Sequence, residues 1–142
     1  MRLHVLWIGR TKFEWVRAAC DEYARRSRRF LRLELTEIGR REGEAALLKI
    51  AAAGRLWLLD PNGDELDSEA FARLVERAFL YEGRELFLAL GGEEGFSAAA
   101  RRQAERRISL SRLTFSHELA RVLLFEQIYR AGAFLAGHPY PR

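Results

Sequence analysis

Residues 86–90 (LFLAL) are apolar at every position, and residues 91–95 (GGEEG) follow them without a break. A continuous apolar run of this length predicts a parallel strand that helices cover on both faces. A glycine-rich segment directly after such a strand lies at the carboxyl edge of the sheet, where open α/β folds bind their ligands. The stretch therefore predicts the central strand of an α/β protein with a ligand site at its end.

Four other segments have the pattern of strands. Residues 3–8 form a short β-type run that ends at Gly9, and residues 56–59 (LWLL) are a second continuous apolar run. Residues 31–38 alternate between apolar and polar side chains, which predicts a strand with one wet face near an edge of the sheet. A short strand is expected around Ile108.

Helical spacing of apolar residues separates these strands. We expect Ser68, Ser97 and Ser116 to act as helix N-caps and residues 60–63 (DPNG) to form a turn. Five strands alternating with five helices predict a doubly wound, mostly parallel α/β sheet in a single domain, residues 1–142. The helices are expected over residues 13–28, 43–53, 68–79, 98–107 and 116–137.

Arginine dominates the positive charge of the chain. Lys and Arg together outnumber Asp and Glu by 24 to 20, and all of the basic residues except Lys12 and Lys49 are Arg. The planar guanidinium favours bidentate contacts with phosphate and stacking on bases, so a nucleic-acid partner is favoured. Arginines on solvated helix faces explain the same composition equally well.

Other compositional features argue against several classes of protein. Cys20 stands alone in a helical pattern, which predicts a buried inert thiol and excludes a disulfide framework. The histidines are scattered, so no metal site is expected. The longest apolar runs are far too short to cross a bilayer and the start of the chain has no signal-peptide pattern, so we expect a cytoplasmic protein without membrane contact.

Two loops have the composition of a ligand site. In residues 91–95 the acidic pair Glu93 and Glu94 would repel a pyrophosphate, so a dinucleotide is disfavoured, whereas S-adenosylmethionine carries cationic groups and no phosphate. Residues 109–115 (SLSRLTF) combine small hydroxyl and apolar residues that suit an adenine. A plain tight turn and an ordinary strand-to-helix loop remain the structural alternatives.

Four blocks of the sequence together carry a family resemblance. They are residues 91–96 (GGEEGF), 109–117 (SLSRLTFSH), 126–131 (EQIYRA) and 138–142 (HPYPR). In this order they resemble the RlmH (YbeA-like) family of SPOUT RNA methyltransferases, and the resemblance runs almost from end to end. It implies S-adenosylmethionine-dependent methylation of N3 of a pseudouridine in large-subunit ribosomal RNA. It also implies a C-terminal trefoil knot and a homodimer.

The resemblance also assigns roles to individual residues. It implies that the tail residues Tyr140 and Arg142 lie at the active site and take part in substrate positioning or methyl transfer. From their chemistry we hypothesise that Tyr140 orients the base and that Arg142 stabilises the charge that develops as N3 loses its proton. The family usually has His where this chain has Pro141, and Pro where it has Ser116. The residues expected to bind the cofactor are Leu59, Gly91, Gly92, Gly95, Leu110, Ser111, Arg112, Leu113, Thr114 and Phe115.

Substrate contacts are expected from His117 and from the basic run that contains Arg25 and Arg29. A helix-start histidine is also typical of a capping residue, and a solvated helix end explains the basic run equally well. The last helix, around residues 119–129, is expected to supply an apolar dimer interface in which each tail completes an active site. Its polar residues Glu126, Gln127 and Arg130 favour an internal hydrogen-bond network or a dimer contact.

Two other classes of function remain open on the sequence alone. One is a nonenzymatic RNA-binding or ribosome-associated module, which would lack a nucleoside cofactor. The other is a different α/β enzyme that uses a nucleotide, but this needs a phosphate-binding loop after the first strand, and residues 9–12 (GRTK) lack the required spacing. Binding of S-adenosylmethionine distinguishes these classes from a methyltransferase.

Overall fold

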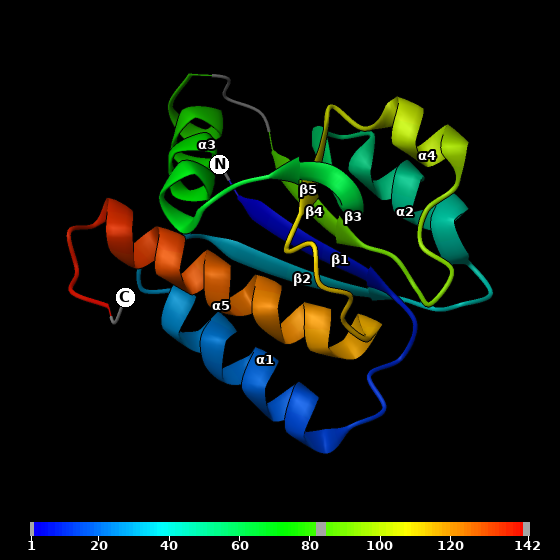
Figure 1. Cartoon of the computed structure of the whole chain (residues 1–142), viewed down its shortest axis with the longest axis horizontal. Coiled ribbons are helices and arrows are strands. Elements are labelled where there is room, and N and C mark those ends of the chain that lie inside the picture. The colour runs from blue at the N-terminus through cyan, green and yellow to red at the C-terminus, as the bar shows by residue number, and fades with distance from the viewer. Residues whose placement is uncertain (1, 82–84, 141–142) are drawn as a thin grey trace.

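Five strands form a single sheet at the centre of the protein. The computed structural model in Figure 1 describes residues 2–81 and 85–140. In this part of the chain the strands are β1 (Leu3–Ile8), β2 (Leu33–Ile38), β3 (Arg55–Glu65), β4 (Leu86–Leu90) and β5 (Arg106–Ser109). Their order is β2-β1-β4-β3-β5, and every neighbouring pair is parallel. The apolar run is the buried central strand β4, and the alternating run is the edge strand β2, as predicted.

Helices cover both faces of the sheet (Figure 1). On one face, α1 (Glu14–Ser27), α3 (Ser68–Tyr81) and α5 (His117–Leu135) pack around a core that includes Trp57, Leu88 and Phe125. On the other, α2 (Gly43–Ala51) and α4 (Ala98–Gln103) pack around Leu6, Leu58 and other apolar residues. Because the buried strands have apolar side chains on both faces, both layers of helices find a hydrophobic surface. The predicted doubly wound α/β fold is confirmed.

The turn predicted at residues 60–63 is wrong. Strand β3 continues through this segment to Glu65, with a shift in its register against β5 between Leu59 and Asp64. The backbone approaches β5 so closely that a Cβ atom on Gly63 would lie 2.6 Å from the backbone of Arg107. Resumed pairing of Asp64 with Ile108 after this bulge overrides the local turn preference.

Two other local predictions need correction. Helix α4 ends at Gln103 instead of residue 107, because Ala104 is extended and the N–H of Glu105 donates to the carbonyl of Leu56 at 2.9 Å, which starts the approach to β5. Helix α3 is capped by Asp67, whose Oδ1 accepts from the N–H of Ala70 at 2.7 Å. Ser68, predicted as that cap, is its first residue. The predicted caps Ser97 and Ser116 are confirmed by the hydrogen bonds that they accept.

Helices α1 and α5 lie side by side and run in the same direction (Figure 1). At their amino ends, the carboxylate of Glu118 accepts from the N–H groups of Lys12 and Phe13. At their carboxyl ends, the ring of Tyr129 contacts the rings of Tyr23 and Phe30. The two ends of this helix pair therefore present different residues, and the candidate site residues divide between them.

Candidate active site

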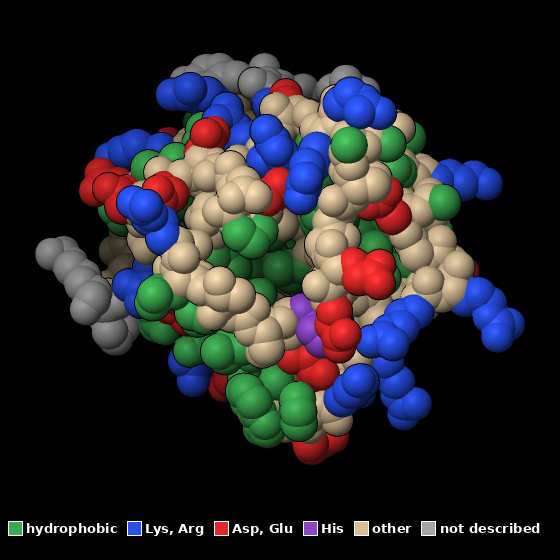
Figure 2. All heavy atoms as spheres, turned by 45° about the vertical axis from the view of Figure 1, so that its right-hand side comes forward, with side chains coloured by type: hydrophobic (Ala, Val, Ile, Leu, Met, Phe, Trp, Pro, Cys, Tyr) green, Lys and Arg blue, Asp and Glu red, His purple; other side chains and the backbone are tan. Residues whose placement is uncertain are grey.

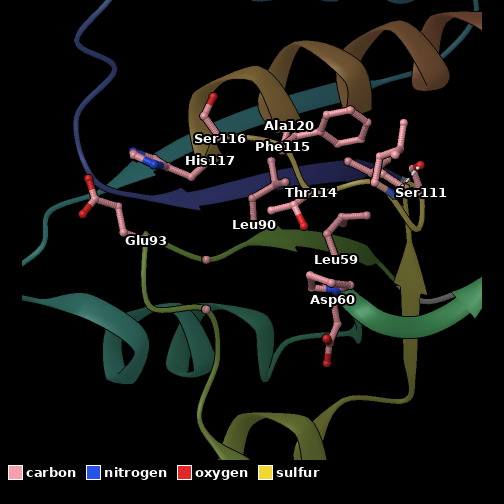
Figure 3. Close-up of a pocket in the computed structure, with 16 residues that line it drawn as sticks. Leu59, Asp60, Leu90, Glu93, Ser111, Thr114, Phe115, Ser116, His117 and Ala120 are labelled. Carbon is pink, nitrogen blue, oxygen red and sulfur yellow. Dashed lines mark hydrogen bonds between the residues drawn. The ribbon is translucent and has the colours of Figure 1, made fainter.

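A cavity of about 360 Å³ opens at the carboxyl edge of the sheet, and we call it the glycine-loop cavity. The ends of β3 and β4, the loop over residues 110–116 and the first turn of α5 converge on it (Figure 3). Figure 2 shows a hollow with a hydrophobic floor and with a histidine and acidic side chains on its rim. The volume is within the range of pockets that hold small molecules and cofactors.

The structure brings most of the predicted cofactor-binding residues together around this cavity. Arg112 is the one predicted member of the loop that does not line it. His117, predicted as a substrate contact, lies at the same cavity, as do Glu93 and Ala120. Of the predicted cofactor residues, those lining the cavity are Leu59, Gly91, Gly92, Gly95, Leu110, Ser111, Leu113, Thr114 and Phe115.

Glycines let the loop after β4 fold back on itself beside the cavity. Gly92 and Gly95 form an isolated antiparallel bridge, and Gly95 has φ +72°, a conformation that favours glycine. A Cβ atom on Gly91 would lie only 3.2 to 3.3 Å from the backbone of Gly95. The cavity wall is therefore bare backbone, whose polar groups a ligand can approach closely.

The second loop forms the opposite wall and is held by its own hydroxyl groups. Ser109 Oγ donates to the carbonyl of Ser111 at 2.9 Å, and Ser111 Oγ accepts from the N–H of Leu113 at 3.0 Å. The side chain of Leu113 is 73% exposed although it is apolar. A bound ligand with an apolar face would cover it, which is a favourable use of exposed hydrophobic surface.

The charge of the glycine-loop cavity argues against a phosphate ligand. Among the described residues that line it, none is Lys or Arg. Glu93 and His117 lie together on one side, whereas the carboxylate of Asp60 points away, toward Arg101 at 3.1 Å and Arg107 at 3.5 Å (Figure 3). A nucleoside with cationic groups, such as S-adenosylmethionine, meets apolar walls, backbone hydrogen-bonding groups and no opposing cation here.

The tail predicted as catalytic lies at the other end of α5. The ring of Tyr140 packs edge-on against Tyr129, with centroids 4.6 Å apart, and the guanidinium of Arg130 lies 4.8 Å from its centroid. Burial, hydrogen bonding with Tyr23 and the charge of Glu126 all raise the pKa of Tyr140 above its ordinary value. The phenol is therefore neutral at ordinary pH. Arg142, the second predicted catalytic residue, is outside the described residues.

The predicted RNA-binding arginines share the tail end of the molecule. Arg25 and Arg29 are exposed at the carboxyl end of α1, where Arg25 donates to Glu22 and Arg29 lies over the ring of Phe30. Tyr129, which contacts Tyr23, Phe30 and Tyr140, is 12 positions after His117 on α5, roughly 18 Å at the usual helical rise. Within one chain, the structure thus separates Tyr140, Arg25 and Arg29 from the glycine-loop cavity.

The polar residues of α5 form an internal network, one of the two alternatives predicted for them. Gln127 accepts from Ser68 Oγ at 2.7 Å and donates to Glu126, which also binds Arg130 at 2.9 Å. Cys20, expected to be a buried inert thiol, is only partly buried, but burial raises its pKa to about 11, which keeps the thiol protonated at neutral pH.

Sequence reasoning missed two buried charged residues on α5, Glu118 and Arg121. Both bind the loop between β1 and α1, more than 100 residues earlier in the chain. Their spacing, one helical turn apart on a largely apolar helix, is the only local signal that could have found them. Within residues 2–81 and 85–140 the structure shows no helix suited to crossing a membrane and no cluster of three or more metal-ligating side chains.

Comparison with known proteins identifies relatives along the entire chain. A family model described as "Predicted SPOUT methyltransferase" matches residues 1–141. A protein of Geobacter sulfurreducens named Ribosomal RNA large subunit methyltransferase H is 43% identical, and the match covers 99% of both chains. A protein of the same name from Anaeromyxobacter dehalogenans is 39% identical over 99% of both chains.

Solved structures share the fold at much lower sequence identity. A probable methyltransferase from Bordetella pertussis matches with a TM-score of 0.60 and 13% identity, over 92% of this chain and 93% of that one. A putative RNA methyltransferase of the TrmH family from Porphyromonas gingivalis matches with a TM-score of 0.50, over 91% of this chain and 59% of that one. At such identities the likeness shows the fold alone.

The sequence matches decide the family, because the model covers nearly all of the chain and the relatives are about 40% identical over their full length. They confirm the predicted enzyme class and the predicted cofactor, since SPOUT methyltransferases use S-adenosylmethionine. The geometry of the glycine-loop cavity agrees with that cofactor. This chain belongs to the SPOUT methyltransferase family.

Proposed function

We propose that this protein methylates N3 of a pseudouridine in large-subunit ribosomal RNA and takes the methyl group from S-adenosylmethionine. The glycine-loop cavity is the observation that supports S-adenosylmethionine as the cofactor. Three chain segments supply apolar and backbone groups to it, and no Lys or Arg lines it. The ribosomal substrate is supported by the name of the relatives, Ribosomal RNA large subunit methyltransferase H. Such a substrate is found in the cytoplasm, where we place the protein.

The residues of this chain would divide the chemistry between them. Leu59, Leu113 and Phe115 hold the adenine of S-adenosylmethionine, and the backbone around Gly91 meets the rest of the nucleoside. The bound cofactor supplies an electrophilic methyl group. The N3 proton of the base passes to solvent as N3 accepts the methyl group, so the ring is transiently more anionic. Arg142 stabilises that charge and the neutral phenol of Tyr140 donates a hydrogen bond that orients the base.

This division of labour requires a second copy of the chain. Tyr140 and the glycine-loop cavity lie at opposite ends of α5. If two copies pack in antiparallel fashion through α1 and α5, a two-fold axis brings the tail of each protomer to the cavity of its partner. We therefore infer a homodimer with two composite active sites, each formed by the cavity of one protomer and the tail of the other.

The outer surface of α1 and α5 suits such an interface. Phe13 and Trp15 at the start of α1 are stacked on each other, and their side chains are 54% and 58% exposed. On α5, Leu119, Val122 and Leu123 are only half-buried within one chain. Association of two copies would cover this apolar surface, and large aromatic residues are frequent anchors of protein interfaces.

Calorimetric titration and a methyl-transfer assay test the proposed function. The protein should bind S-adenosylmethionine and neither NAD nor ATP, because the glycine-loop cavity has no cation for their phosphates. It should transfer a tritiated methyl group to large ribosomal subunits that contain the pseudouridine and not to subunits from a strain that lacks it. Tight binding of NAD without any response to S-adenosylmethionine would refute the assignment.

A further inference from the structure

A second cavity of about 360 Å³ adjoins the glycine-loop cavity, and we call it the basic cavity. It lies where β1 and β2 end, between the segments around Gly9 and Gly39. The two cavities share one wall, which Gly92, Glu93 and His117 form. Any group held in the basic cavity is therefore adjacent to the bound cofactor.

The charges of the two cavities differ. Arg10, Lys12 and Arg40 line the basic cavity together with two carboxylates, Glu37 and Glu93, so cations exceed carboxylates there by three to two. The neighbouring cavity is lined by Asp60 and Glu93 and by no Lys or Arg. Neither Arg10 nor Lys12 forms an ion pair with any of the residues that the structure describes. Arg40 approaches Glu93 at 3.6 Å, but both side chains are more than half exposed, so this pair is weak. Figure 2 shows Lys and Arg side chains gathered beyond the histidine on the rim.

The loop that carries Arg10 and Lys12 is fixed by buried charges. Glu118 accepts from the N–H groups of Lys12 and Phe13 at 3.0 and 3.1 Å. Arg121 donates to Thr11 Oγ1 at 2.9 Å and to the carbonyl of Ile8 at 3.0 Å. We call Glu118 and Arg121 the loop clamp.

Burial of the two charged residues of the loop clamp costs free energy, and their hydrogen bonds hold a loop whose side chains at Arg10 and Lys12 are exposed. Glu118 and Arg121 are 2% and 1% exposed, and burial of charged groups opposes folding unless they are well paired. For Glu118 burial disfavours the charge, but the two backbone hydrogen bonds and Arg121 outweigh it and hold its pKa below the ordinary value. The side chains of Arg10 and Lys12 are exposed and add nothing to the core. The clamp fixes the backbone of a loop whose two cations are exposed and accessible to an external ligand.

We propose that the basic cavity binds a phosphate of the RNA strand that carries the target nucleotide. Arg10, Lys12 and Arg40 neutralise the phosphodiester, and the neighbouring base passes the shared wall of Gly92, Glu93 and His117 into the glycine-loop cavity. This inference rests on the proposed function, because it takes RNA as the substrate. It assigns phosphate binding to Arg10, Lys12 and Arg40, distinct from the arginines at the tail end.

A charge-matched pair of double variants of the full-length protein tests this proposal. Arg10→Ala with Lys12→Ala removes two cations from the basic cavity. The control, Lys49→Ala with Arg77→Ala, removes two exposed cations from α2 and α3, outside both cavities. Binding of a large-subunit ribosomal RNA fragment is measured by fluorescence anisotropy over a range of salt concentrations, together with the KM and kcat of methyl transfer and calorimetric titration with S-adenosylmethionine.

The test variant should bind RNA at least about tenfold more weakly, and the slope of log affinity against log salt should fall by about 2. KM for RNA should rise while cofactor affinity and kcat stay within about twofold, because phosphate contacts position the strand. The control should behave like the wild type. An RNA affinity and salt slope equal to those of the control would overturn the proposal. Failure of the wild type to bind S-adenosylmethionine would instead refute the proposed function.

Discussion

The two ends of α5 are built in opposite ways. At its amino end, loops rich in glycine and small residues leave the glycine-loop cavity open. At its carboxyl end, the space is filled by contacting aromatic rings, those of Tyr129, Tyr140 and Phe30 among them, and arginines surround them. One end has the cavity that can hold a cofactor, and at the other the ring of Tyr140 packs against Tyr129. In the composite site that we propose, a single chain therefore contains two half-sites.

Filling the glycine-loop cavity from its wall should have the largest effect. A Cβ atom on Gly91 lies 3.2 to 3.3 Å from the Gly95 backbone, so Gly91→Val must displace the loop or enter the cavity. We expect affinity for S-adenosylmethionine to fall more than about 100-fold, or about 2.8 kcal/mol. Calorimetric titration measures this, with Gly91→Ala as a smaller step. Unchanged affinity in the Val variant would show that the cofactor binds elsewhere.

Removing the ring of Tyr140, at the carboxyl end of α5, should strongly slow methyl transfer without changing the affinity for S-adenosylmethionine. Tyr140→Ala should lower kcat about 100-fold, because base orientation is lost, while calorimetry gives the wild-type cofactor affinity. Tyr140→Phe keeps the ring packed against Tyr129 and removes only the hydroxyl, so it measures the contribution of the hydroxyl alone. Because its pKa is raised, Tyr140 stays protonated at neutral and mildly alkaline pH, so the Phe variant should not shift the pH profile of kcat between pH 7 and 9. A shift there would contradict the neutral role.

Disrupting the dimer should also abolish methyl transfer, because it separates the cavity of one protomer from the tail of the other. Trp15→Asp places a charge on the exposed aromatic surface and should weaken the dimer by about 100-fold or more, as loss of a central aromatic anchor does. Sedimentation velocity should show monomers that bind S-adenosylmethionine but do not transfer methyl groups. Ile50→Asp, on α2 behind the other face of the sheet and 40% exposed, is the control and should remain dimeric. Active monomers would disprove the composite site.

Weakening the loop clamp should cost stability in a pH-dependent manner. Glu118→Gln replaces the carboxylate that accepts from the N–H groups of Lys12 and Phe13 and removes a negative charge that favours the buried Arg121, so we expect a loss of about 2 kcal/mol in the free energy of unfolding. The pKa of Glu118 is lowered in the folded state, so its contribution is present above the ordinary value of 4.5 and is lost as pH falls through the folded value. Urea unfolding between pH 3 and 7 should show a shallower acid loss in Glu118→Gln than in the exposed control Glu14→Gln. Equal slopes would contradict the assigned role.

Local patterns predicted what local physics determines. The central strand β4, the edge strand β2 and the caps Ser97 and Ser116 depend on hydropathy and on hydrogen bonds between near neighbours. The predictions for the end of α4 and for residues 60–63 were wrong, because pairing with distant strands determines both.

The predicted cofactor residues were brought together because the carboxyl ends of parallel strands meet at one edge of the sheet. The loop clamp was missed because its hydrogen bonds connect residues more than 100 positions apart. The distance of Tyr140 from the glycine-loop cavity was equally invisible, since it follows from the parallel packing of α1 and α5. The C-terminal knot and the catalytic roles in the tail stay predictions.

Complementation between two inactive variants tests most directly whether the tail serves the partner's cavity. Gly91→Val and Tyr140→Ala chains, each expected to have little activity alone, are mixed under conditions that exchange subunits. In a mixed dimer, the intact cavity of the Tyr140→Ala protomer meets the intact tail of the Gly91→Val protomer, which restores one of two sites. Random pairing should therefore recover about one quarter of the wild-type methyl-transfer activity. If mixed dimers form and transfer stays at the level of the separate variants, each tail serves its own chain and the composite site is wrong.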